Sequence, residues 1–170
     1  MRRAYRAAAT AVAQLALALA FFGAVPAAAA EQQQRVALFE FALINTSLEP
    51  TRPDETARLE SLKQVATDQF AKRGLALVDT EPVAAEAAKV NALHLCNGCE
   101  LDLARQVGAD LAAVGWVQKV SNLILNVNMQ IREVESGRLV RAGSVDIRGN
   151  TDEAWRRGIV YLFERRLYPG

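Results

Sequence analysis

The chain has 170 residues, with 20 basic and 19 acidic side chains and a mean hydropathy of +0.04. This length suits one domain with a core of its own. The near balance of charge argues against a nucleic-acid-binding protein, which would carry a basic patch.

The first thirty residues have the pattern of an export signal. Three arginines precede an apolar, alanine-rich run over residues 7–25, and Ala28-Ala29-Ala30 stands before Glu31. A positive segment, an apolar segment and an A-x-A site predict cleavage after Ala30. The alternative is an uncleaved membrane anchor, although the run is short for a spanning helix. We expect a periplasmic protein of residues 31–170 with no membrane span after cleavage, 17 basic and 19 acidic groups and a net charge of −2.

The first half of the expected mature chain alternates strands and helices. Residues 36–41 are apolar at nearly every position, which predicts a buried strand, and the polar residues 45–52 predict a loop. A helix is expected from Pro53 to Gly74, because proline suits a first helical turn and glycine a C-terminal cap. A short strand, a short helix and a second helix follow at residues 75–78, 81–89 and 100–107.

The second half predicts three strands and a last helix. Residues 111–117 form an apolar run, and residues 123–132 alternate, with every second residue apolar from Leu123 to Ile131. This period of two predicts a half-buried strand with one wet face. A turn containing Gly137 leads to a strand at residues 139–147, and Asn150 with Glu153 resembles a capping box that opens the last helix.

The predicted order is therefore β-α-β-α-α-β-β-β-α. A strand-helix-strand start favours a right-handed crossover with parallel pairing, and the last three strands favour an antiparallel meander. We expect a single α/β (α+β) domain whose mixed sheet of about five strands has helices packed on it.

Cys96 and Cys99 are the only cysteines of the chain and stand two residues apart. In an oxidising compartment this pair predicts a disulfide, which would fix the turn before the next helix more than it would stabilise the whole domain. A thiol–disulfide exchange site is the sharper alternative, because a C-x-x-C pair at a helix N-terminus has a lowered thiol pKa. No aromatic residue directly precedes Cys96, whose neighbours are His94 and Leu95.

A metal site is a further alternative at the same place. His94, Cys96, Cys99 and Glu100 offer nitrogen, sulfur and oxygen ligands within seven residues. One C-x-x-C is only half of a zinc site, and a haem attachment would need histidine where Glu100 stands. The primary expectation is therefore no metal and no cofactor.

A polar cluster, Asn45-Thr46-Ser47, follows the first predicted strand. Ligands of open α/β sheets bind beyond the carboxyl ends of parallel strands, so these three residues are a candidate small-ligand site. The alternative is a solvated loop stabilised by turn-forming side chains. Motifs of hydrolases, metalloproteases and nucleotide-binding loops are absent from the sequence, and one histidine offers few general bases, so an enzyme is not expected.

Several segments together resemble a family of small exported bacterial proteins of unknown function, in the domain-of-unknown-function series. They are residues 36–41 (VALFEF), the C-x-x-C pair, residues 103–110 (LARQVGAD), 114–117 (VGWV), 145–149 (VDIRG) and 151–155 (TDEAW). More distantly, the order of elements is similar to the amino-terminal domain of TolB and to the CsgG group. The resemblance implies an envelope domain used for protein contacts.

The sequence thus predicts a non-catalytic periplasmic accessory or binding protein whose partner is an unidentified envelope protein. Two alternatives stay open: a thiol–disulfide factor that uses Cys96 and Cys99, and a metal or small-ligand carrier.

Overall fold

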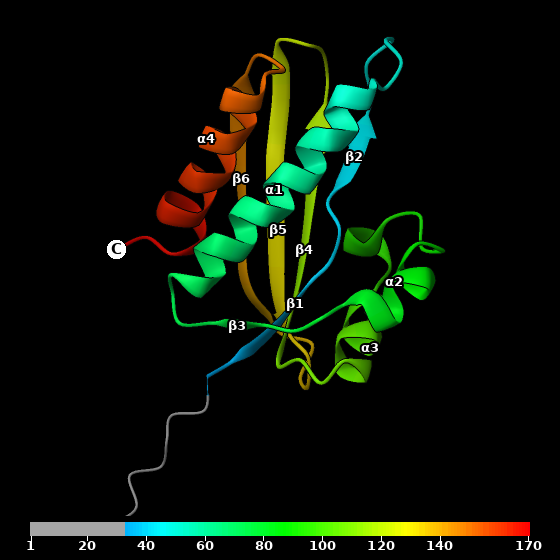
Figure 1. Ribbon diagram of the computed structural model, residues 1–170, viewed down its shortest axis with the longest axis vertical. Coiled ribbons are helices and arrows are strands. Elements are labelled where there is room, and N and C mark those ends of the chain that lie inside the picture. The colour runs from blue at the N-terminus through cyan, green and yellow to red at the C-terminus, as the bar shows by residue number, and fades with distance from the viewer. Residues whose placement is uncertain (1–32) are drawn as a thin grey trace, which may run out of the picture. The chain divides into compact units, whose positions relative to one another are not determined.

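A computed structural model describes residues 33–170 of the chain (Figure 1). The predicted signal peptide and its cleavage site lie outside the described residues. Within the described part, no helix has the length and apolar character that crossing a membrane requires.

The centre of the domain is one mixed sheet whose strands lie in the order β3-β1-β4-β5-β6, with β2 paired to β4 as well. Its six strands are β1 (Arg35–Leu38), β2 (Ala42–Asn45), β3 (Ala76–Leu77), β4 (Leu111–Lys119), β5 (Ile124–Glu133) and β6 (Leu139–Arg148). β1, β2 and β3 take part in parallel pairs, whereas β4, β5 and β6 form the antiparallel meander that the sequence predicts. The predicted fold class is confirmed.

The single strand expected at residues 36–41 is wrong in one respect, because it is two short strands. Leu38 pairs with Ala113 and Ala42 pairs with Trp116, so three residues of the first segment stand against two of β4. Such an extra residue breaks the ladder and bends the strand. Because of the extra residue, Phe39 and Phe41 enter different cores although they stand two positions apart. β2 then runs to Asn45, where the sequence predicts the loop to begin.

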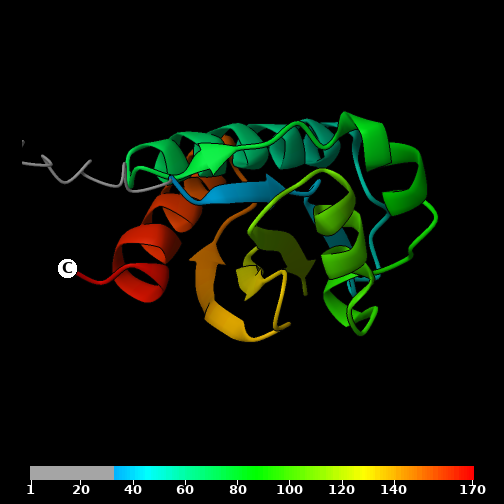
Figure 2. The same ribbon diagram turned by 90° about the horizontal axis from the view of Figure 1, so that it is seen from below.

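The helices are close to their predicted bounds and cover both faces of the sheet. They are α1 (Pro53–Ala71), α2 (Glu81–Ala87), α3 (Cys99–Gln106) and α4 (Asp152–Leu162), with a short 3-10 helix, η1 (Leu93–Leu95), and a short π-helix, η2 (Phe163–Leu167). α1 and α4 pack side by side on one face, and α2 and α3 lie together on the other (Figures 1 and 2).

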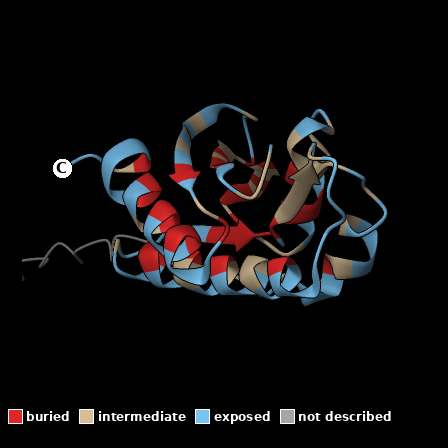
Figure 3. Cartoon of the chain, turned by 90° about the horizontal axis from the view of Figure 1, so that it is seen from above, coloured by how far each residue is buried: buried red, intermediate tan, exposed pale blue. Residues whose placement is uncertain are grey.

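Two apolar cores result, one on each face of the sheet. The larger joins α1 and α4 to the buried side of β5, where Leu125, Val127, Met129 and Ile131 are 0–1% exposed, as the alternation predicts. The smaller joins α2 and α3 to the opposite face of β1 and β4. Figure 3 shows the buried residues of α1 and α4 on the sides of these helices that face the sheet.

Two details of the last segments differ from the sequence prediction. Leu123 is 73% exposed, because β5 begins at Ile124 and Leu123 belongs to the preceding turn. Asn150 is not the cap of α4: Thr151 is, and its hydroxyl accepts a hydrogen bond from the backbone N–H of Ala154. Asn150 is instead buried in a polar network below that helix end.

Candidate functional site

A buried ion pair supports the end of the sheet at which β2 and β4 terminate. Lys119 is the last residue of β4, and its Nζ lies 2.6 Å from Oε1 of Glu55 in the first turn of α1. Both side chains are fully buried. The Glu55 carboxylate also accepts a hydrogen bond of 2.9 Å from the backbone N–H of Arg52 and one from the amide of Asn150. A buried charge is tolerated only when it is paired and hydrogen-bonded in this way.

The electrostatic balance at Glu55 favours its charged form. Burial alone raises the pKa of this carboxyl, but the hydrogen bonds from Lys119, from the Arg52 N–H and from Asn150 hold the pKa below its usual value. Glu55 is therefore an anion that is fixed in place.

Asn150 extends this network to α4 and to the turn between β4 and β5. Its side-chain oxygen accepts hydrogen bonds from Trp155 Nε1 at 2.9 Å and from Arg58 Nη1 at 3.3 Å. Its amide also donates to Asn122 at 3.1 Å. Arg58 forms ion pairs with Asp152 at the start of α4 and with Asp54 in its own helix. The starts of α1 and α4 and the turn between β4 and β5 are thereby joined around the carboxylate of Glu55.

The three polar residues predicted to bind a ligand lie directly above this network and shape a loop. The N–H and the hydroxyl of Thr46 both donate to the carbonyl oxygen of Lys119, at 2.9 and 3.0 Å. The Asn45 oxygen accepts from the N–H and the hydroxyl of Ser47, and its amide donates to the Glu49 carbonyl at 2.8 Å. The structure thus brings the three together, and ligand binding by them stays a prediction.

We define the apex as the loop of residues 46–52 and the turn of residues 120–124, which meet where the side chains of Asn122 and Glu49 bond (top of Figure 1). It carries four exposed large apolar side chains: Leu48, Val120, Leu123 and Ile124. Leu48 is fully exposed and Leu123 is 73% exposed. The apex is therefore the candidate interaction surface within the described residues.

The two cysteines lie elsewhere, beside α3. Cys96 and Cys99 are at disulfide distance, with their Cα atoms 5.6 Å apart, and Cys99 opens α3 after Gly98, whose φ is +117°. The buried carboxylate of Glu100 lies 3.3 Å from Cys96 Sγ and pairs with Arg132 at 2.7 Å. A carboxylate this close disfavours a Cys96 thiolate, which thiol exchange by Cys96 would need.

The alternative metal ligands are only partly together. Ligand atoms of Cys96, Cys99 and Glu100 lie within 4.8 Å of one another. The ring of His94 instead stacks on Trp116 at a centroid distance of 4.3 Å, and burial lowers the pKa of this histidine. Sulfur atoms bonded to each other are not thiolate ligands, so metal binding here would require reduction of the pair.

Sequence reasoning missed the network beneath the apex. Acidic residues suit the first turn of any helix because of the helix dipole, so the sequence around Glu55 gives no sign that this residue pairs with a lysine 64 positions later. The one signal in the sequence is Lys119 itself, a charged residue two positions after the run of residues 111–117, which is apolar at almost every position. The pattern identifies no partner for it.

These features define a class: a small α/β domain with helices on both faces of a mixed sheet and an exposed apolar apex. The family model described as "Protein of unknown function (DUF2380)" matches residues 34–167, and the chain belongs to this family. The predicted resemblance to an uncharacterised family is thus confirmed.

Comparison with curated protein sequences gave no match. Among solved structures, the chain is similar to the LpoB C-terminal domain from Salmonella enterica, with 15% identity, a TM-score of 0.49 and coverage of 68% of this chain and 82% of that one. It is also similar to the PelC dodecamer from Paraburkholderia phytofirmans (13%, 0.48, 76% and 85%). TolB from Acinetobacter baumannii gives 10%, 0.43, and 78% and 28%. At these scores none of them assigns a function.

Proposed function

We propose that this protein is a non-catalytic accessory domain of the bacterial cell envelope, exported to the periplasm, which binds another envelope protein through its apex. The observation that carries the proposal is the exposure of Leu48, Val120, Leu123 and Ile124 on two adjoining segments. The leader-like sequence of residues 1–30 supports export.

The energetics favour a surface that becomes covered. Burying one leucine or isoleucine side chain contributes about 1.5–3 kcal/mol, so covering several at the apex would provide a substantial part of a specific binding energy. The ion pair of Glu55 and Lys119 and the amide of Asn150 fix the loop of residues 46–52 and the turn of residues 120–124 to the rest of the domain. Little conformational entropy is therefore lost when a partner binds.

Site-specific photo-crosslinking in the native host tests the proposal, with the photoreactive residue at Leu48 or Leu123. Leu95 is the matched control, because it is 74% exposed against 73% for Leu123. Leu95 also lies far from the apex. It follows His94, whose carbonyl accepts a hydrogen bond from Gln130, and Gln130 is six residues along β5 from Ile124, or about 20 Å. We expect one discrete crosslinked protein from the two apex positions and none from Leu95. Equal crosslinking at all three, or none at the apex, would contradict the proposal.

Export is tested separately by fractionation and N-terminal sequencing. A periplasmic protein that begins Glu31-Gln32 agrees with the proposal. A protein that retains Met1 and is found in the membrane fraction would contradict cleavage and indicate a membrane anchor instead.

A further inference from the structure

The strand β6 is an open edge of the sheet. It is ten residues long and pairs only with β5 among the described strands, whereas the opposite edge strand, β3, has two residues. Such edges accept an additional strand unless they are short, covered or blocked by charge.

The register shows which backbone groups of β6 point outward. The N–H of Gly149 donates to the Leu123 carbonyl, so this pair is a bonded one, and bonded and non-bonded pairs alternate along an antiparallel ladder. The odd-numbered residues from 143 to 147 therefore bond to β5. The N–H and C=O groups of Ala142, Ser144, Asp146 and Arg148 point away from it, over a length of about 20 Å.

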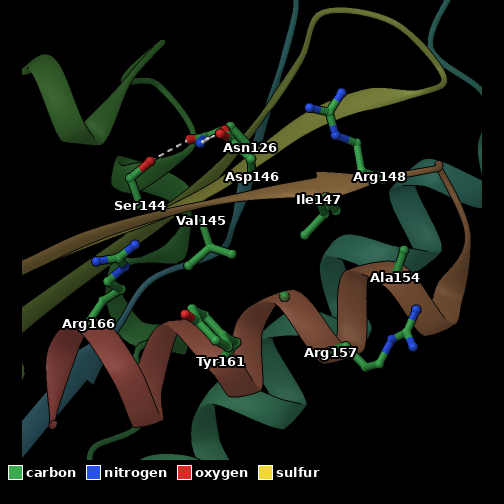
Figure 4. Close-up of a pocket in the computed structure, with 11 residues that line it drawn as sticks. Asn126, Ser144, Val145, Asp146, Ile147, Arg148, Ala154, Arg157, Tyr161 and Arg166 are labelled. Atoms are coloured by element: carbon green, nitrogen blue, oxygen red, sulfur yellow. Dashed lines mark hydrogen bonds between the residues drawn. The ribbon is translucent and has the colours of Figure 1, made fainter.

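A groove of about 570 Å³ runs along this edge, between β6 and α4 (Figure 4). From α4 and the turn after it, Arg157, Tyr161 and Arg166 line it, and from β6 come Val145 and Ile147, whose side chains point towards α4 (Figure 4). An added strand would therefore find apolar contacts and an aromatic ring beside the free backbone groups.

The groove is positively charged. Arg157 and Arg166 line it from the helix side, and Arg148 lies on the opposite face of β6 (Figure 4). Beside Arg148 is a single carboxylate, Asp146, which already accepts a hydrogen bond of 2.7 Å from Asn126. Arg157 is also 3.4 Å from Glu153, but 71% of its side chain remains exposed. An acidic occupant would complement these charges, whereas a second copy of β6 would bring the same arginines to face them.

From this geometry we propose that the β6 edge binds an extended acidic segment of a partner protein, which adds to the sheet as a further strand. Backbone hydrogen bonds from the four outward residues would provide affinity. Acidic side chains would be selected by Arg157 and Arg166 on the helix side of the added strand and by Arg148 on its other side. This surface shares no residue with the apex, although Arg148 pairs with Ile124 of the apex, and the inference does not rest on apex binding.

The test uses strands tethered to the C-terminus of the full domain, which compensates for weak affinity. The chain end lies near β6, because Arg141 donates to the Leu167 carbonyl at 3.0 Å. A Gly/Ser linker of about 10 residues, spanning about 18 Å, would carry the acidic strand TEVEVET or its basic counterpart TKVKVKT. Amide hydrogen exchange at Ala142, Ser144, Asp146 and Arg148 is then read by NMR.

We expect the acidic strand to slow exchange at these four amides at least tenfold and the basic strand to leave it unchanged. Equal protection by both strands, or by neither, would overturn the proposal. Protection of the same amides in the untethered protein together with dimerisation would also overturn it, in favour of a second copy.

Two variants separate backbone pairing from nonspecific charge attraction. Ser144→Pro removes an outward N–H that the ladder with β5 does not use, and proline is tolerated on such edges. Ser144→Ala is its control, because it removes the hydroxyl and keeps the N–H. We expect the acidic strand to protect Asp146 in Ser144→Ala and not in Ser144→Pro, provided that both variants keep the wild-type chemical shifts in α1.

Discussion

Replacing Lys119 by methionine would test whether the buried network holds the end of the sheet together. The change preserves most of the side-chain volume and leaves the Glu55 carboxylate buried without its cation. Removal of one partner of a buried ion pair costs about 3–5 kcal/mol. Because Glu55 retains the Arg52 N–H and the Asn150 amide, we expect the lower end of that range.

The assay is urea unfolding followed by fluorescence, with buried Trp155 as one reporter. A loss of about 3 kcal/mol corresponds to a decrease in melting temperature of about 10 °C for a domain of this size. Glu55→Gln combined with Lys119→Met removes both charges, so the double variant should be more stable than Lys119→Met alone.

The matched control is Arg156→Met, which removes one partner of the exposed pair with Glu153. Pairs of this kind contribute about 0–1 kcal/mol. If Lys119→Met cost no more than Arg156→Met, or if the second substitution brought no recovery, the reasoning on the network would be refuted.

Four further predictions follow, one on acid stability, one on packing and two on the cysteines. Because folding lowers the pKa of Glu55, the contribution of this carboxylate to stability is complete above its ordinary pKa of about 4.5 and is lost as the pH falls through the lowered pKa. The free energy of unfolding of Glu55→Gln should therefore depend less on pH between pH 5 and pH 2 than that of the wild type. Parallel pH curves for the two proteins would contradict this. A Cβ at Gly115 would overlap the ring of Phe41, so Gly115→Ala should lower the free energy of unfolding in urea by about 1–3 kcal/mol. Adding Phe41→Leu to this variant should recover part of the loss, and no recovery would show that the contact is not the cause. Titration of Cys96 and Cys99 in glutathione buffers should give a potential below about −300 mV, as for structural bridges, whereas a value between about −120 and −230 mV would favour thiol exchange. Replacing both cysteines by serine should lower the melting temperature modestly without unfolding the domain, and unchanged stability would remove the structural role.

Much of the fold could be predicted because periodic segments carry their own signal. The alternation in β5 identifies its buried side from Leu125 to Ile131, and Pro53 marks the start of α1. The break in the first strand could not be predicted in the same way. Where both faces of a strand are buried, an apolar run has no period, and Phe39 and Phe41 give no sign that they enter different cores.

The candidate site was less accessible to sequence reasoning. The place of residues 45–47 directly after a strand predicts them as a candidate site. The network that supports them joins Glu55 to Lys119 and Asn150, which stand 64 and 95 positions further along the chain. Patterns of hydropathy report the environment of a residue and not the identity of its partner. The prediction of Asn150 as the helix cap is wrong for this reason, since its place three residues before Glu153 suits a cap and no pattern identifies its partners Glu55 and Trp155.

The position of β4 has a consequence for how this chain folds when it emerges N-terminus first. β1 and β2 both pair with β4, and the contact of Arg35 with Asp110 spans 75 residues. During synthesis or translocation, the apolar segment from Val36 to Phe41 therefore has only the two-residue β3 as a strand partner until β4 has emerged as far as Lys119. The meander of β4, β5 and β6, by contrast, can form from neighbouring segments. The interval in which this domain is most exposed to aggregation, or to a chaperone, is the passage of those roughly 80 residues.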